Sequence, residues 1–173
     1  KDAETIWMKI TDHNVLTNLI NLEGDGYFQE HDNILQKASR NYNSFVKSEI
    51  FNRFRGTEWV IDIGSGKGQD LFRYSKYNMK NVIFLDIDHS ALIELIERKH
   101  SFSTDDKFKN NMNILIQNVD LLDPYQENIQ KIENVYEDKD IDLIMCNFTF
   151  HYLVKDKKSL ENICKLIDYY LKK

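Results

Sequence analysis

Four short apolar segments that alternate with helical patterns constrain the fold of this chain more than any other feature. The segments are WVIDIG at 59–64, NVIFLDID at 81–88, NILIQNVD at 113–120 and IDLIMCNF at 141–148. Helical spacing of apolar residues follows each one, at about 67–77, 90–100, 126–136 and 157–171. Strands that are apolar along their whole length are typical of a parallel sheet covered on both faces. The sequence therefore predicts an α/β fold with a doubly wound, mostly parallel sheet.

Two further helical patterns precede the first of these strands. Residues 4–22 are amphipathic, and a second helix is expected from about Asn33 to Phe54. We therefore divide the chain into an N-terminal helical extension at 1–56 and a sheet-forming core at 57–173. At 173 residues the chain has the length of one domain.

A glycine-rich loop joins the first strand to the helix that follows it. The loop reads G-S-G-K-G-Q, with Gly64, Gly66 and Gly68 at alternate positions. Glycine permits a tight turn there and lets a ligand approach the backbone. The dinucleotide fingerprint requires another glycine where this chain has Gln69. The loop predicts a cofactor site that departs from the dinucleotide pattern.

Three carboxylates accompany that loop at the ends of three successive strands. Asp62 lies in the first strand, where it would repel a pyrophosphate but suit the cationic amino end of S-adenosylmethionine. Asp86 ends the second strand, where an acid can accept hydrogen bonds from ribose hydroxyls. Asp120 ends the third strand, where an adenine edge would lie. The alternative is three aspartates that cap helices or turns, and their coincidence with the loop favours the ligand site.

Three segments resemble mRNA cap guanine-N7 methyltransferases, within a broader likeness to class I methyltransferases over 57–171. SRNYNSFVKSEIF (39–51) resembles the family's R-x-x-N-N-W-I-K-S element, and IDIGSGKGQDL (61–71) resembles its L-D-L-G-C-G-K-G-G-D-L loop. NFTFHY (147–152) resembles its Q-F-x-x-H-Y element. The resemblance implies the Rossmann-like sheet of class I methyltransferases. Such sheets usually continue with further strands, so the core is expected to be C-terminally incomplete, truncated after the fourth strand and the following helix.

The resemblance also implies S-adenosylmethionine as cofactor and assigns residues to it. Lys47 resembles the lysine that reaches the cofactor carboxylate, and Asn147 replaces the family's Gln near the methionine part. The full set of implied cofactor residues is Lys47, Asp62, Gly64, Gly66, Asp86, Asp120, Asn147 and Tyr152. Without the resemblance, Lys47 would be read as a solvated lysine.

Four residues are implied to bind the substrate, the guanine cap of mRNA. Asn43 and Ser44 replace the family's Asn-Asn pair near the cap, and Ser44 departs from it. Lys67 resembles the residue that faces the cap phosphates, with Arg40 a looser candidate, and His151 resembles the residue that contacts guanine.

The reaction that the resemblance implies is methyl transfer to N7 of guanine. N7 carries a lone pair and no proton, so no general base is required and no catalytic residue is assigned. The family's glutamate that reads guanine, and an aromatic residue near the cap, lie beyond the fourth strand, where this chain offers no candidate. On packing alone, His151 and Tyr152 would instead be strand-end residues, and Phe148 and Phe150 are expected in the core.

Charge and cysteine usage bound the partners and the compartment. The net charge of -5 argues against nucleic acid, yet residues 37–80 hold nine basic and four acidic residues. Cys146 and Cys164 lie in apolar segments without metal-ligand spacing, which suits an intracellular, reducing compartment such as cytoplasm, nucleus or virion. No apolar run is long enough to cross a membrane.

The resemblance implies capped RNA as the partner. It also implies a capping enzyme with guanylyltransferase and triphosphatase domains in the same polypeptide, or with a stimulatory subunit. The many Asn, Lys and Ile residues suit a large DNA virus or another AT-rich genome. Two alternatives stay open: another class I methyltransferase acting on a different RNA, protein or small molecule, and a catalytically silent scaffold. An oxidoreductase is disfavoured by Gln69 and Asp62.

Overall fold

The computed structural model describes residues 34–104, 112–136 and 140–171. The helix expected at 4–22 lies outside these ranges. The chain forms two compact units, Lys1–Ser44 and Phe45–Lys173. Helix α3 (Ile34–Arg53) begins in the first unit and ends in the second, at nearly the bounds expected from the sequence.

The second unit is built on a parallel sheet of four strands, as predicted. The strands are β1 (Trp59–Ile63), β2 (Asn81–Asp86), β3 (Asn113–Asn118) and β4 (Leu143–Cys146), in the order β3-β2-β1-β4. All three strand pairings are parallel. Every residue of β1 is buried, which explains why this strand is apolar throughout except for Asp62. Because the strands are parallel, their carboxyl ends meet at one edge of the sheet, where ligands bind in open α/β folds.

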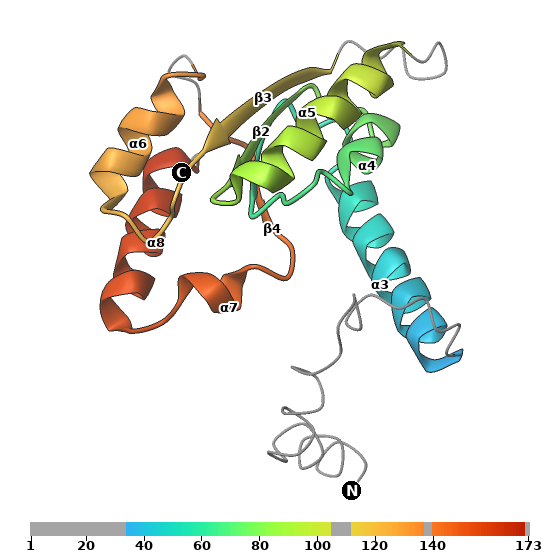
Figure 1. The fold of residues 1–173 in the computed structure, drawn as a ribbon, viewed down its shortest axis with the longest axis horizontal. Coiled ribbons are helices and arrows are strands. Elements are labelled where there is room, and N and C mark those ends of the chain that lie inside the picture. The colour runs from blue at the N-terminus through green and yellow to red at the C-terminus, as the bar shows by residue number, and fades with distance from the viewer. Residues whose placement is uncertain (1–33, 105–111, 137–139, 172–173) are drawn as a thin grey trace, which may run out of the picture. The chain divides into compact units, whose positions relative to one another are not determined.

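Helices cover both faces of the sheet (Figure 1), and the buried apolar residues form a separate core on each face. The helices of this unit are α4 (Leu71–Lys76), α5 (His89–Thr104), α6 (Tyr125–Glu133), α7 (Phe150–Leu153) and α8 (Lys157–Tyr170). Helices α4 and α5, with the end of α3, pack on the face that includes Val60 and Phe84. Helices α6 and α8 pack on the opposite face, around Ile61 and Ile83. The alternation of faces along β1 therefore directs Asp62 toward the α4 side.

Two local features differ from the expectation. Helix α4 begins at Leu71 rather than near Lys67, because the glycine loop extends through Gly68, whose φ is 68°. The NFTFHY segment turns into α7 instead of extending β4, and Phe148 and Phe150 are 65% and 50% exposed. Their expected place in the core was wrong, because β4 ends at Cys146 and the chain leaves the sheet there.

Leu171, the last residue that the structure describes, lies beside the sheet. Leu171 makes an isolated parallel bridge to Ile141, just before β4. In the ranges that the structure describes, no helix is both long and apolar enough to cross a membrane.

Candidate active site

The glycine loop is shaped by close contacts that only glycine permits. Gly64 has φ 68°, and a Cβ added there would collide with the side chain of Thr149, from the segment after β4. Gly68 also has φ 68°, and its added Cβ would lie 2.8 Å from the Cγ of Leu95 on α5. Backbone N–H groups of Gly64 and Ser65 donate to the carbonyl of Leu85 at 2.8 and 3.1 Å. The loop is thereby fixed to the end of β2.

Asp86, at the end of β2, connects that loop to the next turn. Its carboxylate accepts hydrogen bonds from the backbone N–H of Gly66 at 2.6 Å and of Asp88 at 2.8 Å. A carboxylate has about four lone-pair positions, so these two bonds leave acceptor capacity. Asp86 therefore shapes its turn and still presents acceptors to a ligand.

A pocket of about 390 Å³ lies at this edge of the sheet. Four of the predicted residues line it: Gly64, Asp86, Asp120 and Tyr152. The remaining lining is largely apolar, from residues that include Ile87, Leu121, Leu122 and Leu153. An apolar cleft with a few carboxylates at its edge suits a ligand with a flat apolar ring and several hydroxyl groups.

Asp62 is a buried carboxylate behind the glycine loop, and it is not in the pocket lining. Its side chain is 4% exposed. Burial raises the pKa of Asp62 to about 7, and the charges of Asp70 and Asp86 add to the rise. The hydroxyl of Tyr74 and the ammonium of Lys47 act in the opposite direction. A bound cation near Asp62 would lower this pKa again, because it favours the ionised carboxylate that burial disfavours.

Asp70 is a neighbouring carboxylate whose role the sequence did not reveal. It accepts from Lys47 Nζ at 2.5 Å and from Arg73 at 2.6 Å, and it is buried. The ammonium of Lys47 also lies 5.5 Å from the ring centroid of Phe148. Asp70 thus holds Lys47 beside the glycine loop, in a cluster of buried charge.

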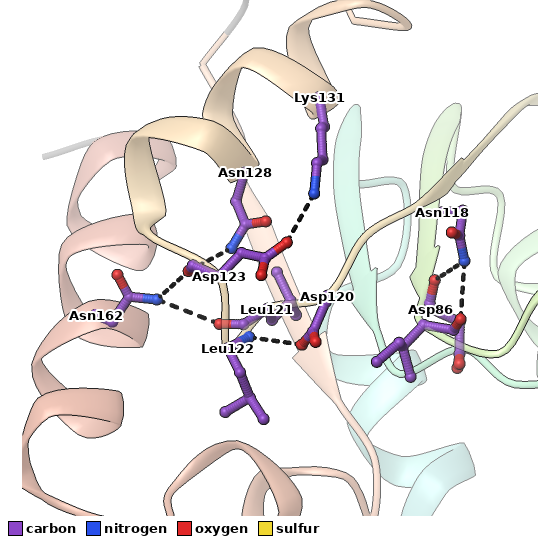
Figure 2. A network of polar contacts seen from close by, with 10 residues as sticks. Asp86, Asn118, Asp120, Leu121, Leu122, Asp123, Asn128, Lys131 and Asn162 are labelled. Carbon is purple, nitrogen blue, oxygen red and sulfur yellow. Dashed lines mark hydrogen bonds and ion pairs between the residues drawn. The ribbon is translucent and has the colours of Figure 1, made fainter.

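The loop after β3 forms the opposite wall of the pocket, and amide side chains brace it (Figure 2). Asn162 on α8 donates to the carbonyls of Leu121 at 3.3 Å and Asp123 at 2.6 Å. Asn128 on α6 donates to the same Asp123 carbonyl at 3.0 Å. The side chain of Asp120 accepts from the backbone N–H of Leu122 at 2.9 Å, so it also has the turn role that the alternative interpretation gave it.

The ion pair in this loop is more exposed than its amides. Lys131 pairs with the Asp123 carboxylate at 2.8 Å, and both side chains are 39% exposed. No sequence signal pointed to Asn162, because its partners are backbone carbonyls about forty residues earlier in the chain.

The segment after β4 carries the remaining cofactor candidates. Phe148 has a φ of 62°, and the hydroxyl of Thr149 donates to the Gly64 carbonyl at 3.3 Å. Among the described residues, the Nδ2 atom of Asn147 and the Oγ atom of Ser65 are buried and have no hydrogen-bond partner. Buried polar atoms of this kind mark places where a ligand can supply the missing partner.

The four residues predicted to bind the substrate lie on different elements and do not line one pocket among those described. The rings of His151 and Tyr152 lie 3.9 Å apart on α7, and both side chains are exposed. Lys67 is exposed and pairs with Glu94 at 2.7 Å. Asn43 and Ser44 lie on α3 in the first unit. No group of three or more His, Cys, Asp or Glu within the described ranges is placed to hold a metal ion.

Comparison with known proteins gives this chain relatives among viral and cellular enzymes. It is 33% identical to an mRNA-capping enzyme of African swine fever virus over 96% of its own length and 19% of the relative's. It is 31% identical to a Caenorhabditis elegans mRNA cap guanine-N(7) methyltransferase over 69% of this chain and 32% of that protein. The chain therefore spans only a small part of the relatives it matches.

The fold has solved counterparts as well. An S-adenosylmethionine-dependent methyltransferase from Clostridium acetobutylicum superposes with a TM-score of 0.51 over 82% of this chain and 55% of the other, at 16% identity. This likeness shows the class I methyltransferase fold. A model of the mRNA (guanine-N(7))-methyltransferase domain matches residues 28–169. Since that match covers most of the sequence, the chain belongs to the mRNA (guanine-N(7))-methyltransferase domain family.

Proposed function

We propose that this chain is the S-adenosylmethionine-binding part of an enzyme that methylates N7 of the guanine cap of mRNA. The observation that carries the proposal is the pocket at the carboxyl edge of the sheet, where the glycine loop meets Asp86 and Asp120. Membership in the cap methyltransferase domain family selects the reaction among the many that this fold supports.

The residues present fit S-adenosylmethionine along its length. Asp62, with its raised pKa, and the unpartnered atoms of Ser65 and Asn147 suit the polar amino acid part of the cofactor. Asp86 retains acceptors for ribose hydroxyls, and the apolar wall near Asp120 suits an adenine ring. We assign Lys47 to the cofactor carboxylate, and Asp70 positions that lysine.

The chemistry asks little of the protein beyond alignment. S-adenosylmethionine, when bound, supplies an electrophilic methyl group to the lone pair of N7. The chain's own residues hold the two reactants in line and exclude water, so no general base is needed. Carboxylates and aromatic faces stabilise positive charge, and we assign that role to Asp62, Asp86 and the exposed rings of Phe148 and Tyr152.

The substrate contacts follow the family pattern and belong to the proposal. His151 and Tyr152 on α7 would contact the guanine and the cofactor, respectively. Lys67 would face the cap phosphates, which requires it to exchange its exposed pair with Glu94 for phosphate oxygens. Asn43 and Ser44 are assigned to the cap as well.

The partners and compartment are proposed on the same basis. Capped RNA is the substrate, and the other capping activities would reside in the same polypeptide or in a stimulatory subunit, since a viral relative is named as an mRNA-capping enzyme. The cysteines at 146 and 164 are free thiols, which supports a reducing intracellular compartment.

The first test is calorimetric titration of the chain with S-adenosylhomocysteine, followed by methyl transfer to GpppA. We expect micromolar binding and a product that enzymatic digestion identifies as 7-methylguanosine. Asp86→Ala should weaken the binding by at least tenfold, because two ribose hydrogen bonds are lost. The exposed Asp140 provides a matched control, Asp140→Ala, that should change nothing. Equal affinity in the wild type and Asp86→Ala would contradict the assigned cofactor site.

A second readout separates cap recognition from cofactor binding. His151→Ala should leave the affinity for S-adenosylhomocysteine unchanged and lower turnover on GpppA. Binding of S-adenosylhomocysteine with methylation of another atom, or of no RNA at all, would retain the cofactor site and reject the cap as substrate.

A further inference from the structure

A second pocket of about 440 Å³ lies between the amino ends of α6 and α8. It borders the first pocket, because Leu122 and Lys155 line both. Nothing in the assigned cofactor or cap contacts uses the rest of its lining. The shared residues lie at the end of the first pocket to which the adenine ring is assigned, and the rest of the second pocket is free for another part of the substrate.

The lining of this second pocket is rich in lysine. Lys155, Lys158 and Lys165 all contribute, and no ion pair among the described residues engages their ammonium groups. The three lysines form a basic cluster on a chain whose net charge is -5. Concentrated positive charge on an otherwise acidic protein favours an anionic ligand at that place.

The lining also holds two acids, Asp156 and Glu161, so the three lysines leave it with a formal excess of one positive charge. Asp156 is the N-cap of α8, and its carboxylate accepts from the backbone N–H of Ser159 at 2.7 Å. This contact lowers the pKa of Asp156, and its charge offsets the positive end of the helix. Glu161 lies 3.7 Å from Lys157, a fourth lysine, which is outside the lining.

An aromatic ring accompanies the lysines. Tyr125 lines the pocket, and the ammonium of Lys165 lies 5.6 Å from the centroid of its ring. Asn162 fixes the start of α6 by accepting from the backbone N–H of Tyr125 at 2.7 Å. Basic side chains beside an aromatic ring are the combination with which proteins bind single-stranded nucleic acid without reading its sequence.

We propose that this lysine pocket binds a nucleotide of the transcript downstream of the cap, with Lys158 and Lys165 on its phosphates and Tyr125 against its base. The proposal rests on the proposed cap methyltransferase function and extends it to the body of the RNA. Lysine ammonium groups on flexible stems suit phosphates of varying geometry, so the contact adds affinity without sequence preference.

The test compares binding of the GpppA dinucleotide with that of a GpppA-capped RNA of about ten nucleotides, a length within the usual range of single-strand sites. The variant is Lys158→Gln with Lys165→Gln, and the control is Lys76→Gln with Lys80→Gln, two exposed lysines outside the lining. The wild type should bind the longer RNA about tenfold more tightly. The pocket variant should lose that gain and keep its affinity for GpppA, and the control should keep both.

Salt dependence gives a readout that a general loss of folding would not produce. The slope of log K against log salt for the longer RNA should become shallower by about 0.7 for each phosphate contact removed. Arginine at both positions should restore the slope. Tyr125→Leu should reduce the gain from added length more than Tyr125→Phe.

Three outcomes would overturn the proposal. The first is equal affinity of the wild type for the dinucleotide and the longer RNA. The second is an equal loss of affinity for the longer RNA in the pocket and control variants. The third is displacement of the longer RNA by an acidic peptide as readily as by unlabelled RNA. Absence of methyl transfer to GpppA, with the length effect intact, would instead reject the proposed function and leave an RNA-binding pocket.

Discussion

The two walls of the proposed cofactor pocket are held in place by different physical means. We call the first the charged wall: the glycine loop with Asp62, Asp70 and Lys47 behind it. We call the second the amide wall: the loop from Asp120 to Pro124, held by Asn162 and Asn128. In the charged wall, Lys47 and Arg73 both pair with Asp70, and burial raises the pKa of Asp62 to about 7. In the amide wall, neutral side chains donate to backbone carbonyls.

The difference matches what each wall is proposed to bind. Burial disfavours the ionised form of Asp62, so a ligand with a cationic group stabilises that form strongly. An apolar ring instead needs a surface of fixed shape, which neutral hydrogen bonds provide without introducing charge. In the proposed site, a cationic group of the ligand offsets the unfavourable burial of the Asp62 carboxylate.

The largest expected effect follows from closing the space above Gly64. Gly64→Ala places a methyl group against Thr149 in a backbone conformation with positive φ. Backbone strain and overpacking together should lower the free energy of unfolding by about 2–4 kcal/mol and reduce affinity for S-adenosylhomocysteine at least a hundredfold. Urea unfolding and calorimetry measure the two effects.

Gly56 supplies the matched control for that substitution. Its φ is 79°, and nothing lies within 4 Å of an added Cβ. Gly56→Ala should therefore cost only the backbone strain, about 1 kcal/mol, and leave cofactor binding intact. Equal effects of the two substitutions would show that contact with Thr149 does not matter.

Asp62→Asn tests the charged wall through its pH dependence. The folded protein keeps Asp62 protonated up to about pH 7, whereas the unfolded chain releases that proton near its ordinary pKa of 3.8. Stability from this group is therefore lost as pH rises between about 4 and 7, by at most about 1.4 kcal/mol per pH unit. Asp62→Asn should flatten that decline in urea unfolding.

Cofactor affinity should show the opposite trend with pH. A bound ammonium group favours ionised Asp62, so affinity for S-adenosylhomocysteine should rise with pH up to about 7 in the wild type. Asp62→Asn should abolish this rise and weaken binding about tenfold or more at pH 8, by removing a charge-assisted contact. A variant with the wild-type pH profile would exclude Asp62 from the cofactor site.

Asn162→Leu probes the amide wall and should have an intermediate effect. The substitution removes the donor to the Leu121 carbonyl and the acceptor of the Tyr125 N–H. Asn128 still donates to the Asp123 carbonyl. The substitution should destabilise the fold by about 1–3 kcal/mol. Affinity for S-adenosylhomocysteine should fall about tenfold as the loop relaxes, and its pH dependence should stay as in the wild type. A changed pH profile would show that the two walls are coupled.

The smallest effect is expected from the ion pair in the amide wall. Lys131→Met removes the partner of the Asp123 carboxylate, but both side chains are 39% exposed and screened by water. Unfolding free energy should change by less than about 1 kcal/mol. Affinity measured by calorimetry should stay within about twofold. A loss as large as that of Asn162→Leu would mean that charge, rather than amides, holds this loop.

The sequence predicted the parallel sheet, and the structure confirms it. The sequence also grouped Asp62, Asp86 and Asp120 with the glycine loop at one edge; Asp86 and Asp120 line one pocket with Gly64, whereas Asp62 is buried outside that lining. The periodicity of apolar residues and the spacing of the motifs were enough for this prediction, because parallel strands bring their carboxyl ends to one edge of the sheet. The same reasoning missed the ion pairs of Asp70. It also misplaced Phe148 and Phe150, since an apolar run after β4 does not reveal where the strand ends.

What the sequence determined by itself is the order of elements, the glycine loop and the family. These depend on local spacing and on motifs of a few residues. Only the tertiary structure decided that Thr149 lies against Gly64, that Asn162 braces the loop after β3, and that burial raises the pKa of Asp62. Those properties arise from residues that are distant in the chain, and contact and desolvation exist only once the layers have packed.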